Sequence, residues 1–137
     1  MRVVEAQQGE AFLPGRAYIA PIGRHMRIRG SVDDPRISLE RDLEDSMHVP
    51  AIDELMVSVA EIFGSRCLGV VLTGMGVDGA AGLLAIRRAG GVTLAQPAET
   101  AFMSSMPEAA AEVGAVLETV ALDRMADVIA HRVTGYV

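Results

Sequence analysis

One aspartate stands in a glycine-rich turn, where an apolar run gives way to the small residues that open a helix. Residues 68–82 read LGVVLTGMGVDGAAG, which places Asp78 among Gly74, Gly76 and Gly79. These glycines let the backbone turn sharply and approach another group closely. A buried strand before the turn would put the Asp78 carboxylate at the carboxyl end of a parallel sheet, where open α/β folds bind their ligands. We therefore predict that this turn is the functional centre of the chain.

Asp78 has three possible uses in such a turn. The carboxylate could accept a hydrogen bond from a histidine Nδ1–H and support the imidazolium formed in acyl transfer, while backbone N–H groups stabilise an oxyanion. It could instead cap the helix that follows, by accepting from that helix's first N–H groups. The G-x-G-x-x-G spacing also fits a dinucleotide site. There, however, Asp78 would face a pyrophosphate, and like charges about 4 Å apart cost about 4 kcal/mol at an effective dielectric near 20.

Hydrophobic periodicity predicts an α/β fold around this turn. Apolar side chains three and four positions apart predict an amphipathic helix over residues 52–63, with Gly64 as its stop. After it, strands are predicted at 68–73, 92–95 and 116–120, and helices at 79–89, 107–112 and 122–133. Continuous apolar strands between helices are typical of a doubly wound, mostly parallel sheet with helices on both faces. Before it, short strands are predicted at 17–20, 26–28 and 37–39, the last two as a hairpin.

Composition limits the class of protein. The chain has 137 residues, of which 50% are hydrophobic and 22% are charged, so one domain can form a core without a stabilising metal. Cys67 is the single cysteine, which excludes an internal disulfide and favours a cytoplasmic protein. The net charge of −6 argues against a nucleic-acid partner. No run approaches the roughly 18 apolar residues of a membrane span, and the first ten residues lack a secretory signal.

The motifs carry a family resemblance. TGMGVDGAAGLLAIRRAGG, followed by LAQ and then MPEAA, resembles the catalytic domain of the chemotaxis receptor protein-glutamate methylesterases. LPGRAYIAP and the following GRHM match the same family in the same order, so the likeness covers nearly all of the chain. The resemblance implies a doubly wound α/β domain that hydrolyses glutamate γ-methyl esters on bacterial chemoreceptors and, in related enzymes, deamidates receptor glutamines. It also implies a Ser-His-Asp triad with no metal and no cofactor.

The resemblance assigns roles to the glycine-rich turn. By motif, Asp78 matches the triad aspartate, and Met75 matches the residue whose backbone N–H helps to form the oxyanion hole. Gly74, Gly76 and Gly79 match the turn that presents both. In the family, the nucleophilic serine, the triad histidine and an amino-terminal receiver domain all precede the point where this chain begins. Residues 1–137 are therefore expected to be a single partial methylesterase-type catalytic domain, without its N-terminal strands and without a receiver domain.

Two functions follow from this expectation. The first is a methylesterase-derived chain that carries only the aspartate and the oxyanion loop, and is inactive alone. The second is a non-catalytic assembly module, because a sheet that lacks its first strands exposes an edge. That edge could pair with a complementing chain or, in a homodimer, with a second copy.

Residues within the chain match the missing serine and histidine poorly. Ser65, in FGSRC, lacks the G-x-S-x-G elbow that exposes a nucleophilic hydroxyl. Ser104 and Ser105 lie in FMSSMP, which the family places near the site, but no histidine is close to them in sequence. None of the histidines matches the triad position: His25, His48 and His131. Where many members have Arg-Pro-Ser before the amphipathic helix, this chain has Val49-Pro50-Ala51, which removes a guanidinium and a hydroxyl from a loop expected to border the substrate cleft.

Overall fold

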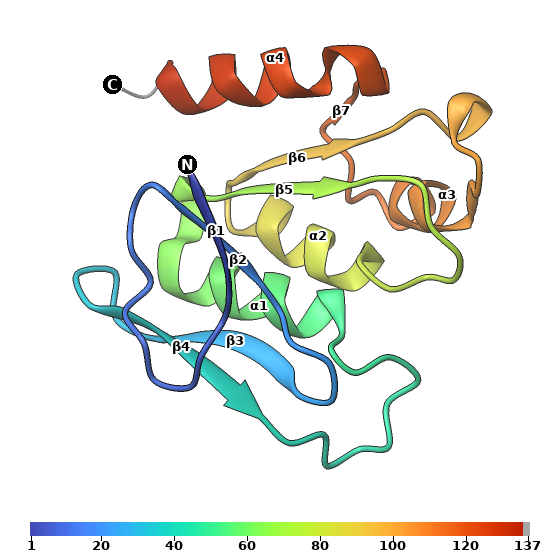
Figure 1. Cartoon of the computed structure of the whole chain (residues 1–137). Helices are drawn as coiled ribbons and strands as arrows, with labels where there is room; N and C mark the ends of the chain where they lie inside the picture. Colours follow the sequence, from blue (N-terminus) through green and yellow to red (C-terminus); the bar gives the residue numbers. More distant parts are fainter. Residues whose placement is uncertain (136–137) are drawn as a thin grey trace.

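A three-stranded parallel sheet lies between layers of helix in the computed structural model, which describes residues 1–135 (Figure 1). The strands run in the order β5-β6-β7, and all pairs are parallel. Helices α2 and α3 pack on one face with α1 behind α2, and α4 covers the other face. The bounds are β5 Leu68–Val71, β6 Val92–Ala95, β7 Glu118–Thr119, α1 Ile52–Phe63, α2 Ala80–Arg88, α3 Ser105–Glu112 and α4 Leu122–Thr134.

The first forty residues form two further strand pairs beside α1. Strands β3 (His25–Gly30) and β4 (Pro35–Glu40) make an antiparallel hairpin, whose buried side chains pack against α1. Strands β1 (Arg2–Glu5) and β2 (Arg16–Ile19) pair in parallel, and Figure 1 shows them crossing in front of α1. The chain also forms two single-turn 3₁₀ helices, η1 (Gly64–Arg66) and η2 (Ala98–Thr100).

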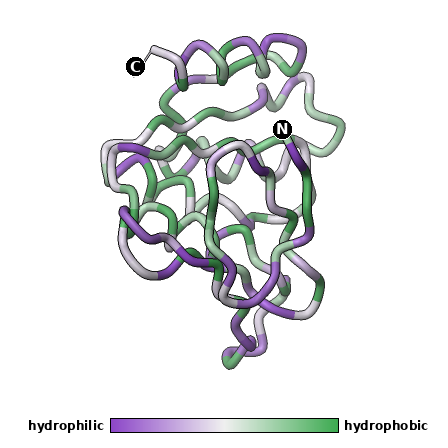
Figure 2. The backbone as a smooth tube through the Cα atoms, turned by 60° about the vertical axis from the view of Figure 1, so that its left-hand side comes forward, coloured by the Kyte–Doolittle hydropathy of each residue, from purple (hydrophilic) through white to green (hydrophobic). Residues whose placement is uncertain are grey.

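Hydrophobic side chains fill both sides of the central sheet. Val71 and Leu83 belong to the core between the sheet and α2, while Leu94 and Met125 belong to the core under α4. Figure 2 shows hydrophobic and hydrophilic residues alternating along α4, as expected for an amphipathic helix with one face on the sheet. In the part of the chain that the structure describes, no helix is long and apolar enough to cross a membrane.

Helices α1 and α2 approach closely at their amino-terminal ends, because Gly82 has no side chain. A Cβ added at Gly82 would lie 2.6 Å from Met56 Cβ and 3.0 Å from Asp53 Cα. Interior contacts of this length are shorter than the separation at which nonbonded carbon atoms attract. Gly82 therefore sets the distance between the first turn of α1 and the turn that precedes α2.

The predicted α/β architecture is confirmed, with local differences. The hairpin and the helices were predicted, but β1 was not, because VV is its only apolar pair and both of its valines lie outside the buried core. Strand β5 ends at Val71, two residues before the predicted end, and β7 has only two residues. The α3 helix starts at Ser105, before the predicted Pro107, because proline is well tolerated in the first turn of a helix.

Candidate functional site

The glycine-rich turn leaves the sheet at the carboxyl end of β5 and leads into α2. Gly76 and Gly79 have φ angles of +96° and +99°, a region that residues with a side chain rarely adopt. Gly74 is needed for a different reason, since a Cβ there would overlap the sulfur of Met106. The three glycines thus allow the left-handed backbone and the close contact with α3 that shape this turn.

Asp78 caps the preceding helix, not the one that follows it. Its Oδ2 accepts a hydrogen bond from the Ile52 N–H at 2.8 Å, and its Oδ1 accepts from the Asp53 N–H at 3.0 Å. These are the first N–H groups of α1, which have no partner within the helix. The capping interpretation was therefore wrong about the helix: α1 begins 26 residues before Asp78 in the sequence but lies beside it in the fold.

Asp53 caps α2 in return. Its Oδ1 accepts from the Gly79 N–H at 2.9 Å and from the Gly82 N–H at 2.7 Å. The capping is thus reciprocal: Asp78, just before α2, caps α1, and Asp53, in α1, caps α2. The dinucleotide alternative loses its support here, because a pyrophosphate would need the N–H groups at this helix start, and a carboxylate already holds two of them. Burial raises the pKa of the Asp53 carboxyl, the Gly82 N–H opposes the shift, and the nearby Asp78 charge adds to it.

The raised pKa of Asp53 predicts a pH-dependent effect of the substitution Asp53→Asn. The folded state of an acid with a raised pKa binds more protons than the unfolded state. Stability therefore falls as pH rises above 3.8, the ordinary pKa of an aspartate. Asparagine keeps an acceptor oxygen but has no proton to lose. We expect the free energy of unfolding of Asp53→Asn, relative to the wild type, to increase between pH 4 and pH 7 in urea titrations. A constant difference across this range would contradict the assignment.

Each oxygen of Asp78 keeps capacity for another hydrogen bond. A carboxylate oxygen has two lone pairs, and each Asp78 oxygen accepts one bond from α1. The side chain is partly exposed, so a donor from outside the described residues can still reach it. His48 is the histidine that the fold brings to this turn: its Nε2 lies 3.6 Å from the position of a Cβ built on Gly76.

Met75 projects from the turn next to the start of α3. Its side chain is 73% exposed, and within the described residues its backbone N–H donates to no acceptor. The groups on either side are held: the Gly76 N–H donates to Ser105 Oγ at 3.0 Å, and Ser105 Oγ donates to the Gly74 carbonyl at 3.1 Å. The Met106 N–H donates to the same carbonyl at 3.2 Å.

The segment before α3 and the end of β6 support the start of the turn. Thr73 Oγ1 donates to the Met103 carbonyl at 3.1 Å and accepts from the Met103 N–H at 2.8 Å. The Gly74 N–H donates to the same carbonyl at 3.0 Å. The Thr73 N–H donates to Oε1 of Gln96, a buried side chain directly after β6. Two neighbouring strands thus position the turn at one edge of the sheet.

The other histidines and Ser65 lie in different surroundings. His25 in β3 is buried. Its Nδ1 accepts from the Ala51 N–H at 3.1 Å, and its Nε2 lies 3.2 Å from Asp42 Oδ1. It therefore links the segment before α1 to the hairpin. Ser65 precedes β5, at the amino end of the strand whose carboxyl end carries the turn. Ser104 is adjacent to α3, but its side chain makes no capping bond to that helix.

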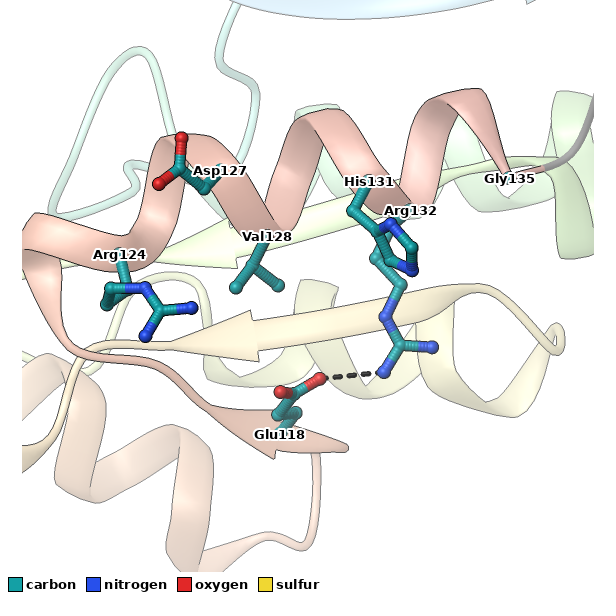
Figure 3. A pocket seen from close by; sticks show the side chains of 7 residues that line it. All are labelled: Glu118, Arg124, Asp127, Val128, His131, Arg132 and Gly135. Carbon is teal, nitrogen blue, oxygen red and sulfur yellow. Dashed lines mark hydrogen bonds and ion pairs between the residues drawn. The ribbon is translucent and has the colours of Figure 1, made fainter.

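His131 borders a hollow that is separate from the turn. This hollow has a volume of about 750 Å³ and lies between α4 and β7 (Figure 3). Arg132 in it donates to Glu118 at 2.7 Å, while Arg124, Asp127 and His131 project from α4 around it. None of its lining residues belongs to the turn or to the segment before α3, so it forms no part of the candidate site.

Asp53 and the bridging role of Ser105 were missed in the sequence. An acidic residue in the first turn of a helix is ordinary, and nothing in the local pattern of Asp53 indicates a partner 26 residues away at Gly79. Ser105 carried a weak signal, because its loop was expected near the site. Within the described residues, no group of three or more His, Cys, Asp or Glu side chains is arranged to hold a metal ion.

The fold and the site define a doubly wound α/β domain with a carboxylate and an unpaired backbone N–H at the carboxyl edge of its parallel sheet. A family model described as CheB methylesterase matches residues 1–129. The chain belongs to the CheB methylesterase family.

Known proteins of this family are similar along most of the chain. A protein-glutamate methylesterase/protein-glutamine glutaminase of Geobacter sulfurreducens is 43% identical over 96% of this chain, and an Escherichia coli K12 relative is 42% identical over 97%. The chain spans only 36% and 38% of the length of these two relatives. The crystal structure of the Thermotoga maritima CheB methylesterase catalytic domain superposes with a TM-score of 0.82 at 30% identity, over 88% of this chain and 64% of that one.

Proposed function

We propose that this chain supplies the aspartate and the oxyanion loop of a protein-glutamate methylesterase site, whose serine and histidine lie outside these 137 residues. The observation that carries the proposal is the turn after β5, where a partly exposed carboxylate and an unpaired N–H lie three residues apart at the carboxyl edge of the sheet. The similarity to relatives named as methylesterases and glutaminases supports the same reaction class.

Each group has a distinct role in this proposal. Asp78 would accept the Nδ1–H of the incoming histidine, which fixes its tautomer and stabilises the imidazolium after serine loses its proton. The Met75 N–H would donate to the oxygen that becomes negative when serine attacks the γ-carbonyl carbon. Collapse of the tetrahedral intermediate expels methanol from a methyl ester, or ammonia from a glutamine amide. Water then releases the glutamate carboxylate from the serine.

The family assignment supports a substrate and a location for the chain. We propose methyl-accepting chemotaxis receptors as the partner, which puts the chain in the cytoplasm. The exposed side chains of Met75, Val77 and Phe102 give the candidate site an apolar border that fits a methyl ester better than a free carboxylate.

The remaining part of the site would pair with free strand edges. Within residues 1–135, β5 pairs with β6 alone and β2 pairs with β1 alone, so each has one edge with unpaired backbone groups. A segment carrying the serine and the histidine would satisfy these groups by adding strands. The alternative occupant is a second copy of the chain, in a homodimer without catalysis. Sedimentation at micromolar concentration separates the two, since only the second gives a dimer of the isolated chain.

We expect the 137-residue chain to release no methanol above background from methylated receptor. Triad members act together, and loss of the nucleophile or base from such hydrolases removes several powers of ten in rate. The positive control is a longer protein, in which the serine- and histidine-bearing segment of a family member precedes this chain. Rapid turnover by the isolated chain would overturn the proposed division of the site.

A further inference from the structure

We propose that Ser105 is a positioning residue, which aims the Met75 N–H away from α3 and towards the reacting oxygen. The inference rests on the proposed function for its catalytic consequence, but its geometric part stands on the contacts of the turn. The Ser105 hydroxyl bridges the residues on both sides of Met75: it donates to the Gly74 carbonyl and accepts from the Gly76 N–H.

The geometry follows from the planar peptide group. The Gly74 carbonyl and the Met75 N–H belong to one trans peptide, so they point in opposite directions. Two donors at the start of α3 hold this carbonyl, the Ser105 hydroxyl at 3.1 Å and the Met106 N–H at 3.2 Å. Because the carbonyl is fixed towards α3, the Met75 N–H must point away from it.

The second bond of the hydroxyl removes a competing donor. The Gly76 N–H is the next donor in the turn, and its bond to Ser105 Oγ directs it into the protein. The Met75 N–H has no acceptor within residues 1–135, and neither do the Val77 and Asp78 N–H groups further along the turn. Because both hydrogen-bonding functions of its hydroxyl are used inside the turn, Ser105 is poorly suited to act as the nucleophile itself.

The experiment measures the turn directly in the isotope-labelled 137-residue chain. Ser105→Ala is compared with Ser105→Thr, which keeps the hydroxyl, and with Ser104→Ala, which removes a neighbouring hydroxyl that does not cap α3. We expect Ser105→Ala to increase hydrogen exchange of the Gly76 amide about fivefold, the loss of one ordinary hydrogen bond. We also expect it to change the residual dipolar coupling of the Met75 N–H. Ser105→Thr should restore both values.

Unchanged Met75 coupling in Ser105→Ala, within the scatter of Ser104→Ala, overturns the inference. Ser105→Cys keeps the side-chain volume with a weaker donor and acceptor, and should give intermediate values even if the alanine variant does not fold. In the longer protein that completes the site, Ser105→Ala should lower kcat about tenfold and leave KM unchanged. This decrease is smaller than the one caused by losing an oxyanion donor itself. A longer wild-type protein without turnover counts against the proposed function and leaves the Met75 measurement standing.

Discussion

Replacing Asp78 with asparagine is expected to lower kcat for methyl-ester hydrolysis about 10⁴-fold in a longer protein that completes the site. The neutral amide no longer stabilises the imidazolium and can hold the histidine in the wrong tautomer. The same substitution should destabilise the 137-residue chain by about 1–2 kcal/mol, because one of the two α1 N–H groups then faces the amide NH2 without an acceptor and the other keeps only a neutral one. Methanol release and urea denaturation measure the two effects separately.

Asp123→Asn is the matched control for this experiment. Asp123 is likewise a carboxylate near the start of a helix: it lies in the first turn of α4, but it is exposed. Its loss should cost no more than about 1 kcal/mol and leave kcat unchanged. If Asp78→Asn lowers stability but leaves kcat intact, Asp78 is a helix cap alone, and the catalytic assignment falls.

Both roles of Asp78 are compatible in one geometry. The hydrogen bonds from α1 hold the carboxylate in one orientation, which is what an orienting member of a hydrolytic triad requires. Asp53 fixes the other side of the same contact by binding the Gly79 N–H. This reciprocal capping couples the start of α1 to the shape of the turn. Substitutions at the two aspartates should therefore have non-additive effects on stability.

The sequence predicted most of the fold because its signals are local. The 52–63 helix has a strong apolar face, and the strands around the turn are continuous apolar runs, so periodicity located them well. Strand β1 was missed because its pairing with β2 stabilises a short segment that has little hydrophobic pattern of its own. Short strands depend on such nonlocal partners more than helices do.

The sequence located the turn of the candidate site but not the distant residues that hydrogen-bond to it. Glycine spacing and the aspartate located the turn, since those residues act through local backbone geometry. Ser105, Gln96 and Asp53 reach the turn from 23 to 29 residues away, across separate elements. Their distances along the chain carry no periodic signal, and only the folded chain brings them together.

Gly82→Ala is expected to destabilise the chain by about 2 kcal/mol, the opposite of its usual effect in a helix. Alanine normally stabilises a helix interior by about 0.5–1 kcal/mol relative to glycine. Here the added Cβ would lie 2.6 Å from Met56 Cβ and 3.0 Å from the backbone of Asp53, which rigid helices relieve only by moving apart. That movement also stretches the bonds from Asp53 to Gly79 and Gly82, so hydrogen exchange of the Gly79 amide should increase.

The neighbouring substitution Ala81→Gly calibrates the effect of helix propensity. Ala81 is on the same turn of α2 but faces solvent, so glycine there should cost only about 1 kcal/mol. Urea denaturation of the two variants should thus show alanine favoured at position 81 and glycine favoured at position 82. If Gly82→Ala stabilises the chain instead, a Cβ fits between the two helices, and the close approach at Gly82 is not what keeps Asp53 against the glycine-rich turn.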